Sequence, residues 1–409
     1  MKFTKIALAA AVTLVAAQAQ AATVYLAGAS ATQANYRSAL VSLCSGTATT
    51  IISTADTNKS AVKCSVDFTG LPGVNAVAIS VNGGSFTAVT TSVGNASETF
   101  VNVADNSGNT LTAPRQSEGG FLDIDAAAFP ASEYATFGIT SAPATQPAAF
   151  SQVFGVAVSP ELYTALQTAQ GLPASCGIDS LTAACQPSIT KAQYTAIVSD
   201  AFNTAKQDVN AILGVGAAGD KLTVCRRVST SGTQASSNQY FLNAFIGGDG
   251  AAAGALIPAD AANYASANSG LTSYDVQEGS GTGNTRACLS TVGTATEPFY
   301  ALGVLSLENY PDLTTRTPVR ADRKFRYVKI NGVAAYDGNE ATPGKSTASA
   351  KAGKYDFWFT SQKFASTANG QAVVDAIDAK LGTVDLNGLF GNGLSAAKRN
   401  SNTSPVTFE

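Results

Sequence analysis

The residues best suited to chemistry in this chain lie in a short turn, residues 229–233 (STSGT), that follows an apolar run and two arginines. A helical pattern begins at this turn, and the start of a helix offers free N–H groups and the positive end of a dipole to an anion. We expect Ser231, Gly232 and Thr233 to contribute backbone and hydroxyl donors there. Arg227 can supply the countercharge as a planar fork. A plain helix N-cap beside a surface arginine is the alternative that the pattern leaves open.

A second turn of the same kind occurs near the N-terminus. Residues 23–27 (TVYLA) are typical of a buried strand, residues 28–32 (GASAT) of a small-residue turn, and residues 33–43 of a helix. Two such units, far apart in sequence and both ending in hydroxyl residues, favour one shared anion site. A third stretch, residues 279–284 (GSGTGN), is a weaker phosphate-loop candidate, because no clear strand precedes it and Gly-x-Gly-x-x-Gly is incomplete.

The composition argues against several classes of function. The chain has no histidine, which removes the commonest general base and every Ser-His-Asp or Cys-His scheme. Charged residues make up only 13% of the chain and the net charge is −3, which argues against a nucleic-acid partner. The cysteine spacings do not suit zinc. We therefore expect a binding protein rather than an enzyme, with no cofactor and no metal.

The first 21 residues have the pattern of a secretory signal peptide. Lys2 and Lys5 precede an apolar stretch over residues 6–17, and residues 19–21 (AQA) form a small-x-small cleavage site. The apolar stretch is too short for a stable membrane span, and no later run approaches the required length. The sequence therefore predicts a periplasmic or secreted protein, cleaved near Ala21, with no transmembrane segment.

The cysteine count is even, as is usual in an oxidising compartment. The six cysteines are Cys44, Cys64, Cys176, Cys185, Cys225 and Cys288. Six cysteines allow 15 connectivities, so the sequence alone leaves the pairing open. We expect sequential pairing, because each bridge then closes a loop within one region.

Strand and helix patterns alternate along the chain, which indicates an α/β protein. We expect strands over residues 74–81, 86–93, 154–158, 222–225, 300–307, 325–330 and 355–360, and a strand running into a turn over residues 119–131. We expect further helices over residues 160–170, 190–213 and 365–382. Residues 140–150, which contain two prolines, have the character of a segment that crosses between domains.

Four landmarks, in order and at similar spacing, resemble the periplasmic phosphate-binding proteins of ABC uptake systems. They are the turn at residues 28–32, the Arg227-x-x-x-Ser231-Gly232-Thr233 spacing, residues 283–292, and residues 301–304 (ALGV). Each motif alone is weak, and the four in register are more specific. The resemblance covers most of the chain, and residues 45–118 match worst.

This resemblance implies a two-lobed type 2 periplasmic binding protein fold with crossing strands between the lobes. Lobe one would comprise residues 22–148 plus 297–409, and lobe two residues 149–296. The lobes would close around a desolvated small oxyanion such as phosphate, and an ABC permease would be the partner. Carried over from the family, the anion-binding residues are Thr32, the Gln33 backbone, Ser85, Arg227, Ser231, Gly232 and Thr233.

One departure from the family pattern concerns a ligand-contacting aspartate. When the sequence is aligned through Pro130, Ala128 stands where that aspartate is expected, and Asp125 could replace it only after a register shift. An absent carboxylate would let sulfate compete with phosphate. It also favours an alternative function, a secreted structural or adhesive protein that reuses the fold without transport.

Overall fold

The computed structural model describes residues 22–199, 209–217, 220–242, 274–294, 296–312, 320–335, 347–386 and 388–408. The signal peptide expected over residues 1–21 lies outside the described residues. So does the middle of the helix expected over residues 190–213.

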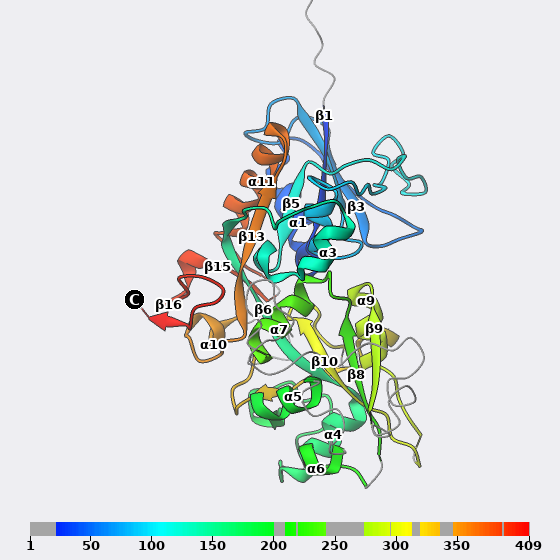
Figure 1. Ribbon diagram of the computed structural model, residues 1–409, viewed down its shortest axis with the longest axis vertical. Helices are drawn as coiled ribbons and strands as arrows, with labels where there is room; N and C mark the ends of the chain where they lie inside the picture. The colour runs from blue at the N-terminus through cyan, green and yellow to red at the C-terminus, as the bar shows by residue number, and fades with distance from the viewer. Residues whose placement is uncertain are drawn as a thin grey trace, which may run out of the picture.

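One large sheet runs through the molecule, and helices pack against it (Figure 1). Its strand order is β2-β3-β4-β1-β5-β13-β6-β10-β8-β9. The α/β class expected from the sequence is confirmed. The strands of this path are β1 (Ala22–Gly28), β2 (Ala48–Ile52), β3 (Lys59–Cys64), β4 (Val74–Ser80), β5 (Gly119–Leu122), β6 (Gln146–Val158), β8 (Leu222–Arg227), β9 (Tyr274–Gly279), β10 (Tyr300–Ser306) and β13 (Trp358–Ala365).

The helices and shorter strands connect and cover this sheet. The helices are α1 (Gln33–Leu43), α2 (Phe86–Thr90), α3 (Ala131–Thr136), α4 (Pro160–Ala169), α5 (Lys191–Val198), α6 (Val209–Leu213), α7 (Gly232–Phe241), α9 (Thr282–Leu289), α10 (Ala348–Lys351) and α11 (Ala368–Leu381). The shorter strands are β7 (Ser188–Ile189), β11 (Arg326–Tyr327), β12 (Lys329–Ile330), β14 (Asp385–Leu386), β15 (Leu389–Gly391), β16 (Ala397–Lys398) and β17 (Thr407–Phe408).

The first sheet half, strands β1 to β5 with β13, is built around β1. This strand pairs in parallel with β4 and with β5, and parallel strands are buried on both faces. Residues 24–27 are accordingly apolar and buried. Val373, Ile377 and Leu381 share one face of helix α11, and their side chains are buried in the core against this half of the sheet.

Strand β6 crosses from the first sheet half to the second, which consists of β10, β8 and β9 (Figure 1). Its N-terminal part pairs with β13, and residues 154–158 pair with β10. The crossing segment expected over residues 140–150 is therefore largely the beginning of this long strand. Strand β10, which follows residue 297, pairs with β8 and β6, and β12 pairs with β7.

Two expectations about local structure were wrong. Residues 86–90 form helix α2 rather than a strand, with Phe86, Val89 and Thr90 buried. Apolar residues in so short a segment fit either periodicity, and packing decides between them. The helix that starts after Thr190 ends at Val198, because Ser199 adopts an extended conformation (φ −80°, ψ 137°).

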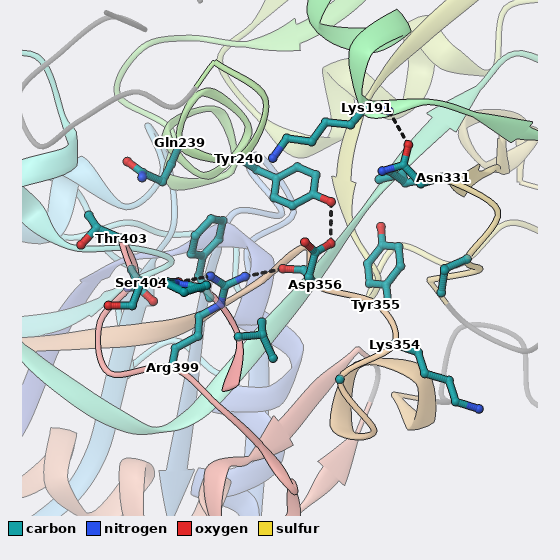
Figure 2. A pocket seen from close by; sticks show the side chains of 17 residues that line it. Lys191, Gln239, Tyr240, Asn331, Lys354, Tyr355, Asp356, Arg399, Thr403 and Ser404 are labelled. Atoms are coloured by element: carbon teal, nitrogen blue, oxygen red, sulfur yellow. Dashed lines mark hydrogen bonds between the residues drawn. The ribbon is translucent and has the colours of Figure 1, made fainter. Parts of the chain in front are cut away.

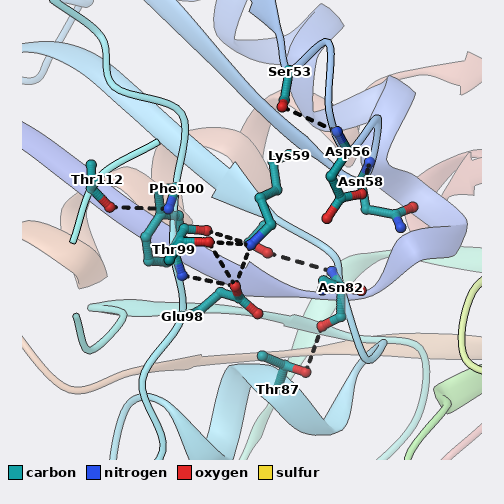
Figure 3. Close-up of polar contacts among 11 residues, drawn as sticks. Ser53, Asp56, Asn58, Lys59, Asn82, Thr87, Glu98, Thr99, Phe100 and Thr112 are labelled. Carbon is teal, nitrogen blue, oxygen red and sulfur yellow. Dashed lines mark hydrogen bonds and ion pairs between the residues drawn. The ribbon is translucent and has the colours of Figure 1, made fainter. Parts of the chain in front are cut away.

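A buried lysine, Lys59, makes several polar contacts within the region between residues 45 and 118 (Figure 3). The ammonium of Lys59 forms an ion pair with Glu98 and donates to the Thr99 carbonyl oxygen at 2.9 Å. Both charged side chains are largely buried, so removing either one would leave an unpaired charge in the interior. This interaction attaches the segment after α2 to β3.

Three disulfides join the six cysteines in sequential order. Cys44–Cys64 links the end of α1 to β3, and Cys176–Cys185 closes a short loop. Cys225–Cys288 links β8 to α9. The last of these attaches helix α9 to the strand that carries Arg227.

Peptide mapping without reduction is expected to recover these three pairs. The Cα atoms of each pair lie 5.0–5.9 Å apart, which is within the range that a disulfide spans. A free thiol, or a peptide that joins Cys44 to Cys288, would contradict the pairing.

Candidate functional site

Strand β8 carries Arg227 to an edge of the sheet where two helices begin. In the parallel ladder Arg227 lies opposite Gly279, the last residue of β9. The chain leaves both strands at this edge, and α7 and α9 start after short turns. Because carboxyl ends of parallel strands meet at one edge, residues 229–233 and residues 279–284 converge. The weak phosphate-loop candidate therefore does follow a strand, contrary to the expectation.

The Arg227 side chain is buried and bridges the two sheet halves. Its Nη1 donates to Thr282 Oγ1 at 2.9 Å and to Ser30 Oγ at 3.2 Å. Ser30 lies just after β1 and therefore belongs to the first sheet half. Nη2 and Nε donate to the carbonyl oxygens of Ser280 and Gly279. Burial lowers the pKa of Arg227 to about 10, while Asp123 acts in the opposite direction. The guanidinium is therefore charged at neutral pH.

Asp123 is a buried carboxylate near Arg227, and the sequence pattern did not identify it as a site residue. It directly follows β5, its backbone N–H donates to Ser85 Oγ at 3.1 Å, and Thr233 Oγ1 lies 3.5 Å from its Oδ2. Burial raises the pKa of Asp123 to about 6, although Arg227, Ser85 and Thr233 all lower it. A carboxyl group with this pKa is poised to hold or accept a proton near neutral pH.

Two glycines allow the sheet halves to touch at this point. Gly84, at φ 80°, lies against the Cα of Ser231 and the guanidinium of Arg227. A Cβ at Gly232 would lie 2.1 Å from Ser85 Oγ and 2.7 Å from Asp123 Oδ2. Only glycine fits there without moving the turns apart.

Gly232→Ala is expected to destabilise the protein by about 1–3 kcal/mol, the usual cost of overpacking a tight site. The added methyl group would push α7 away from the turn that carries Ser85. Urea unfolding measures the loss. Gly177→Ala is the matched control, because nothing lies within 4 Å of its Cβ position. Equal stability of the two variants would mean that the two turns are not packed this tightly.

Two buried polar atoms near Arg227, Ser231 Oγ and Asp123 Oδ1, have no hydrogen-bond partner among the described residues. Ser231 occupies the N-cap position of α7, yet its hydroxyl does not cap the helix. Unpaired buried polar groups are costly, so their concentration beside a buried arginine points to a polar ligand.

The other predicted residues are placed as follows. Thr32 is fully buried, and its hydroxyl lies 3.5 Å from the Ala29 carbonyl oxygen. The Gln33 backbone N–H, expected to face an anion, already donates to the Ser30 carbonyl oxygen. Ser30 itself is the residue of this turn that contacts Arg227.

The carboxylate beside Arg227 is neither at position 128 nor at position 125. Ala128 lies in a short 3₁₀ turn (Ala126–Ala128) and packs against the hydrophobic core. Asp125 accepts a hydrogen bond from Asn402 at 2.9 Å. Among these positions, Asp123 is the acid that lies near Arg227.

Within the described ranges, no cluster of three or more histidine, cysteine, aspartate or glutamate side chains is arranged to hold a metal ion. None of the helices in that part of the chain combines the length and the apolar character that a membrane span requires.

Comparison with solved structures finds a likeness of fold. No family model matches the chain, and no curated protein matches it. A Clostridium perfringens structure, assigned as a phosphate ABC transporter substrate-binding protein and solved with bound phosphate, matches with a TM-score of 0.43. The two sequences are 12% identical, and the match covers 90% of this chain and 99% of the other. At those values the likeness bears on neither the ligand nor the role of any residue.

Proposed function

We propose that the chain is an exported solute-binding protein that encloses a small oxyanion between two lobes. The observation that carries this proposal is the buried, charged Arg227 at the start of two helices. Around it lie the unpartnered Ser231 hydroxyl and one unpartnered Asp123 oxygen. Helix starts, hydroxyls and one arginine are the donors that a desolvated oxyanion requires.

Asp123 favours an oxyanion that carries a proton. A protonated phosphate oxygen can donate to the carboxylate, whereas fully ionised sulfate has no proton to offer and is repelled. We therefore propose phosphate over sulfate. The sequence predicted that sulfate would compete with phosphate, because Ala128 replaces the expected aspartate. We propose the reverse, with Asp123 providing the carboxylate.

The proposal includes the boundaries of the two lobes and the compartment in which the protein acts. Residues 22–148 would form most of lobe one, and β6 and β13 would cross between the lobes. We assign residues 297–335 to lobe two with residues 149–296, because β10, β11 and β12 pair with β8, β6 and β7. Lobe one would then be completed by the rest of the chain after residue 335. The protein would act in the periplasm or after secretion, with an ABC permease as partner.

Titration calorimetry with phosphate and with sulfate at neutral pH tests the proposal. Phosphate is expected to bind more tightly than sulfate, and phosphate at about 100 times its dissociation constant should stabilise the fold by about 2.7 kcal/mol. Comparable binding of both anions would contradict the role of Asp123.

A structural or adhesive role for the same fold is the second candidate. Arg227 already donates to Ser30, Gly279, Ser280 and Thr282 without a ligand, as a purely structural arginine would. In that case neither anion would bind or stabilise the protein.

A further inference from the structure

A polar cavity of about 600 Å³ lies at the far end of helix α7 from Arg227 (Figure 2). Gln239 and Tyr240 line it from the last turn of α7, and Lys191 lines it from the first residue of α5. The opposite wall comes from residues 353–359 and residues 399–406. Gly232 and Tyr240 are separated by about 12 Å of helix, so this cavity is distinct from the anion site.

The cavity has more positive than negative charge. Lys191, Lys354 and Arg399 line it, and Asp356 is the one acid among the described lining residues. Asp356 is already engaged, because the Tyr240 hydroxyl donates to its carboxylate and Arg399 donates to its backbone oxygen. Its negative charge favours the charged forms of both Lys191 and Arg399, but one carboxylate among three cations leaves the described lining with a net positive charge.

Two of the cationic groups have spare capacity for a ligand. The Lys191 ammonium lies 4.1 Å from the centroid of the Tyr240 ring, and no ion pair with a described residue engages it. Arg399 donates from Nη1 to the Ser404 carbonyl oxygen and from Nη2 to the Asp356 carbonyl oxygen. Each of these nitrogens carries a second N–H, which a carboxylate could accept.

Aromatic rings form much of the remaining wall. Tyr240, Tyr355 and Phe359 line the cavity. The Tyr355 hydroxyl donates to the Phe154 carbonyl oxygen, so its ring rather than its hydroxyl is available to a ligand. Flat apolar walls with a few placed charges are typical of sites for small organic molecules, and the volume is in the usual range for them.

We propose that this cavity binds a small aromatic carboxylate, with its carboxylate between Lys191 and Arg399 and its ring against Tyr355 and Phe359. This goes beyond the proposed oxyanion binding and does not depend on it. The ligand would contact α7 on one wall and the C-terminal segment on the other.

Saturation-transfer NMR with 4-hydroxybenzoate is the direct test. The uncharged 4-hydroxybenzamide controls for the carboxylate, and cyclohexanecarboxylate controls for the ring. Trp358 offers a second readout, because it is the only tryptophan and Arg399 lies 4.9 Å from its ring centroid. We expect 4-hydroxybenzoate to bind and to change the tryptophan emission, and both control compounds to bind roughly tenfold more weakly or not at all.

Variants separate this cavity from the anion site. Lys191→Gln is expected to weaken 4-hydroxybenzoate binding by roughly tenfold or more, whereas Lys221→Gln, outside the cavity, and Arg227→Ala should not change it. Three results would overturn the proposal: no binding to the unmodified protein, equal binding to Lys191→Gln, or displacement by inorganic phosphate. Binding of phenyl phosphate but not of the benzoate would overturn the assignment of a carboxylate.

Discussion

Replacing Arg227 by alanine is expected to weaken phosphate binding by roughly 2–5 kcal/mol, the range for removing one partner of a desolvated charge pair. Arg227 is 1% exposed, so water cannot replace its charge. The loss would also remove the charge that lowers the pKa of Asp123, so the buried carboxyl would hold its proton more readily. Titration calorimetry on both proteins measures the difference.

Arg226→Ala is the matched control for this experiment. Arg226 is the neighbouring arginine and is also buried, but its guanidinium pairs with Glu278 at 3.1 Å. Its removal should affect stability and leave phosphate affinity unchanged. If Arg227→Ala bound phosphate as tightly as the unmodified protein, Arg227 would not belong to the anion site.

Asp123→Asn is expected to stabilise the ligand-free protein by about 3 kcal/mol above pH 6. Burial raises the pKa of this carboxyl from 3.8 to about 6 in the folded protein. Between those values the folded protein holds the proton and the unfolded chain releases it, so stability falls as pH rises from about 4 to about 6. Above that window the folded protein carries the full cost of a buried charge, and asparagine removes it.

Urea unfolding at several pH values through this window measures the effect. The unmodified protein should lose stability as the pH rises, and the Asp123→Asn variant should lose about 3 kcal/mol less. Asp125→Asn is the control. Asp125 lies two residues after Asp123 in the chain, but its carboxylate accepts a hydrogen bond from Asn402. The same dependence on pH in all three proteins would show that Asp123 does not titrate in this range.

The same variant probes ligand choice. Without the negative charge at position 123, sulfate should gain relative to phosphate, because the repulsion of a fully ionised anion is removed. An unchanged ratio of the two affinities would separate Asp123 from anion selectivity, whatever its effect on stability.

Part of the candidate site could be predicted because its residues are consecutive. The apolar run before Arg227 and the small residues at 229–233 are local features, and they form β8 and the start of α7 as expected. The turn at 28–32 was placed correctly too. The residue of this turn that contacts Arg227 differs from the predicted one. The Gln33 N–H donates to the Ser30 carbonyl oxygen, whereas the Ser30 hydroxyl accepts a hydrogen bond from Arg227.

Asp123 could not be predicted because the choice depends on contacts between distant segments. Asp123 and Asp125 lie two residues apart after the same strand, and nothing local tells which of them enters the site. Contact with Ser85, Gly232 and Thr233, which come from both sheet halves, makes Asp123 the buried acid. An alignment through Pro130 ignored these contacts and selected Ala128 instead.

By itself the sequence determined the α/β class and the local elements of the proposed anion site, namely the strand before Arg227 and the turn and helix that follow it. These depend on periodicity and turn chemistry, which act over a few residues. Only the tertiary structure decided that α9 begins beside Arg227, since β9 pairs in parallel with β8. Only the tertiary structure placed the end of α7 near residues 399–406, where both line the polar cavity. Long-range strand pairing and packing set these contacts, and they leave no local pattern in the sequence.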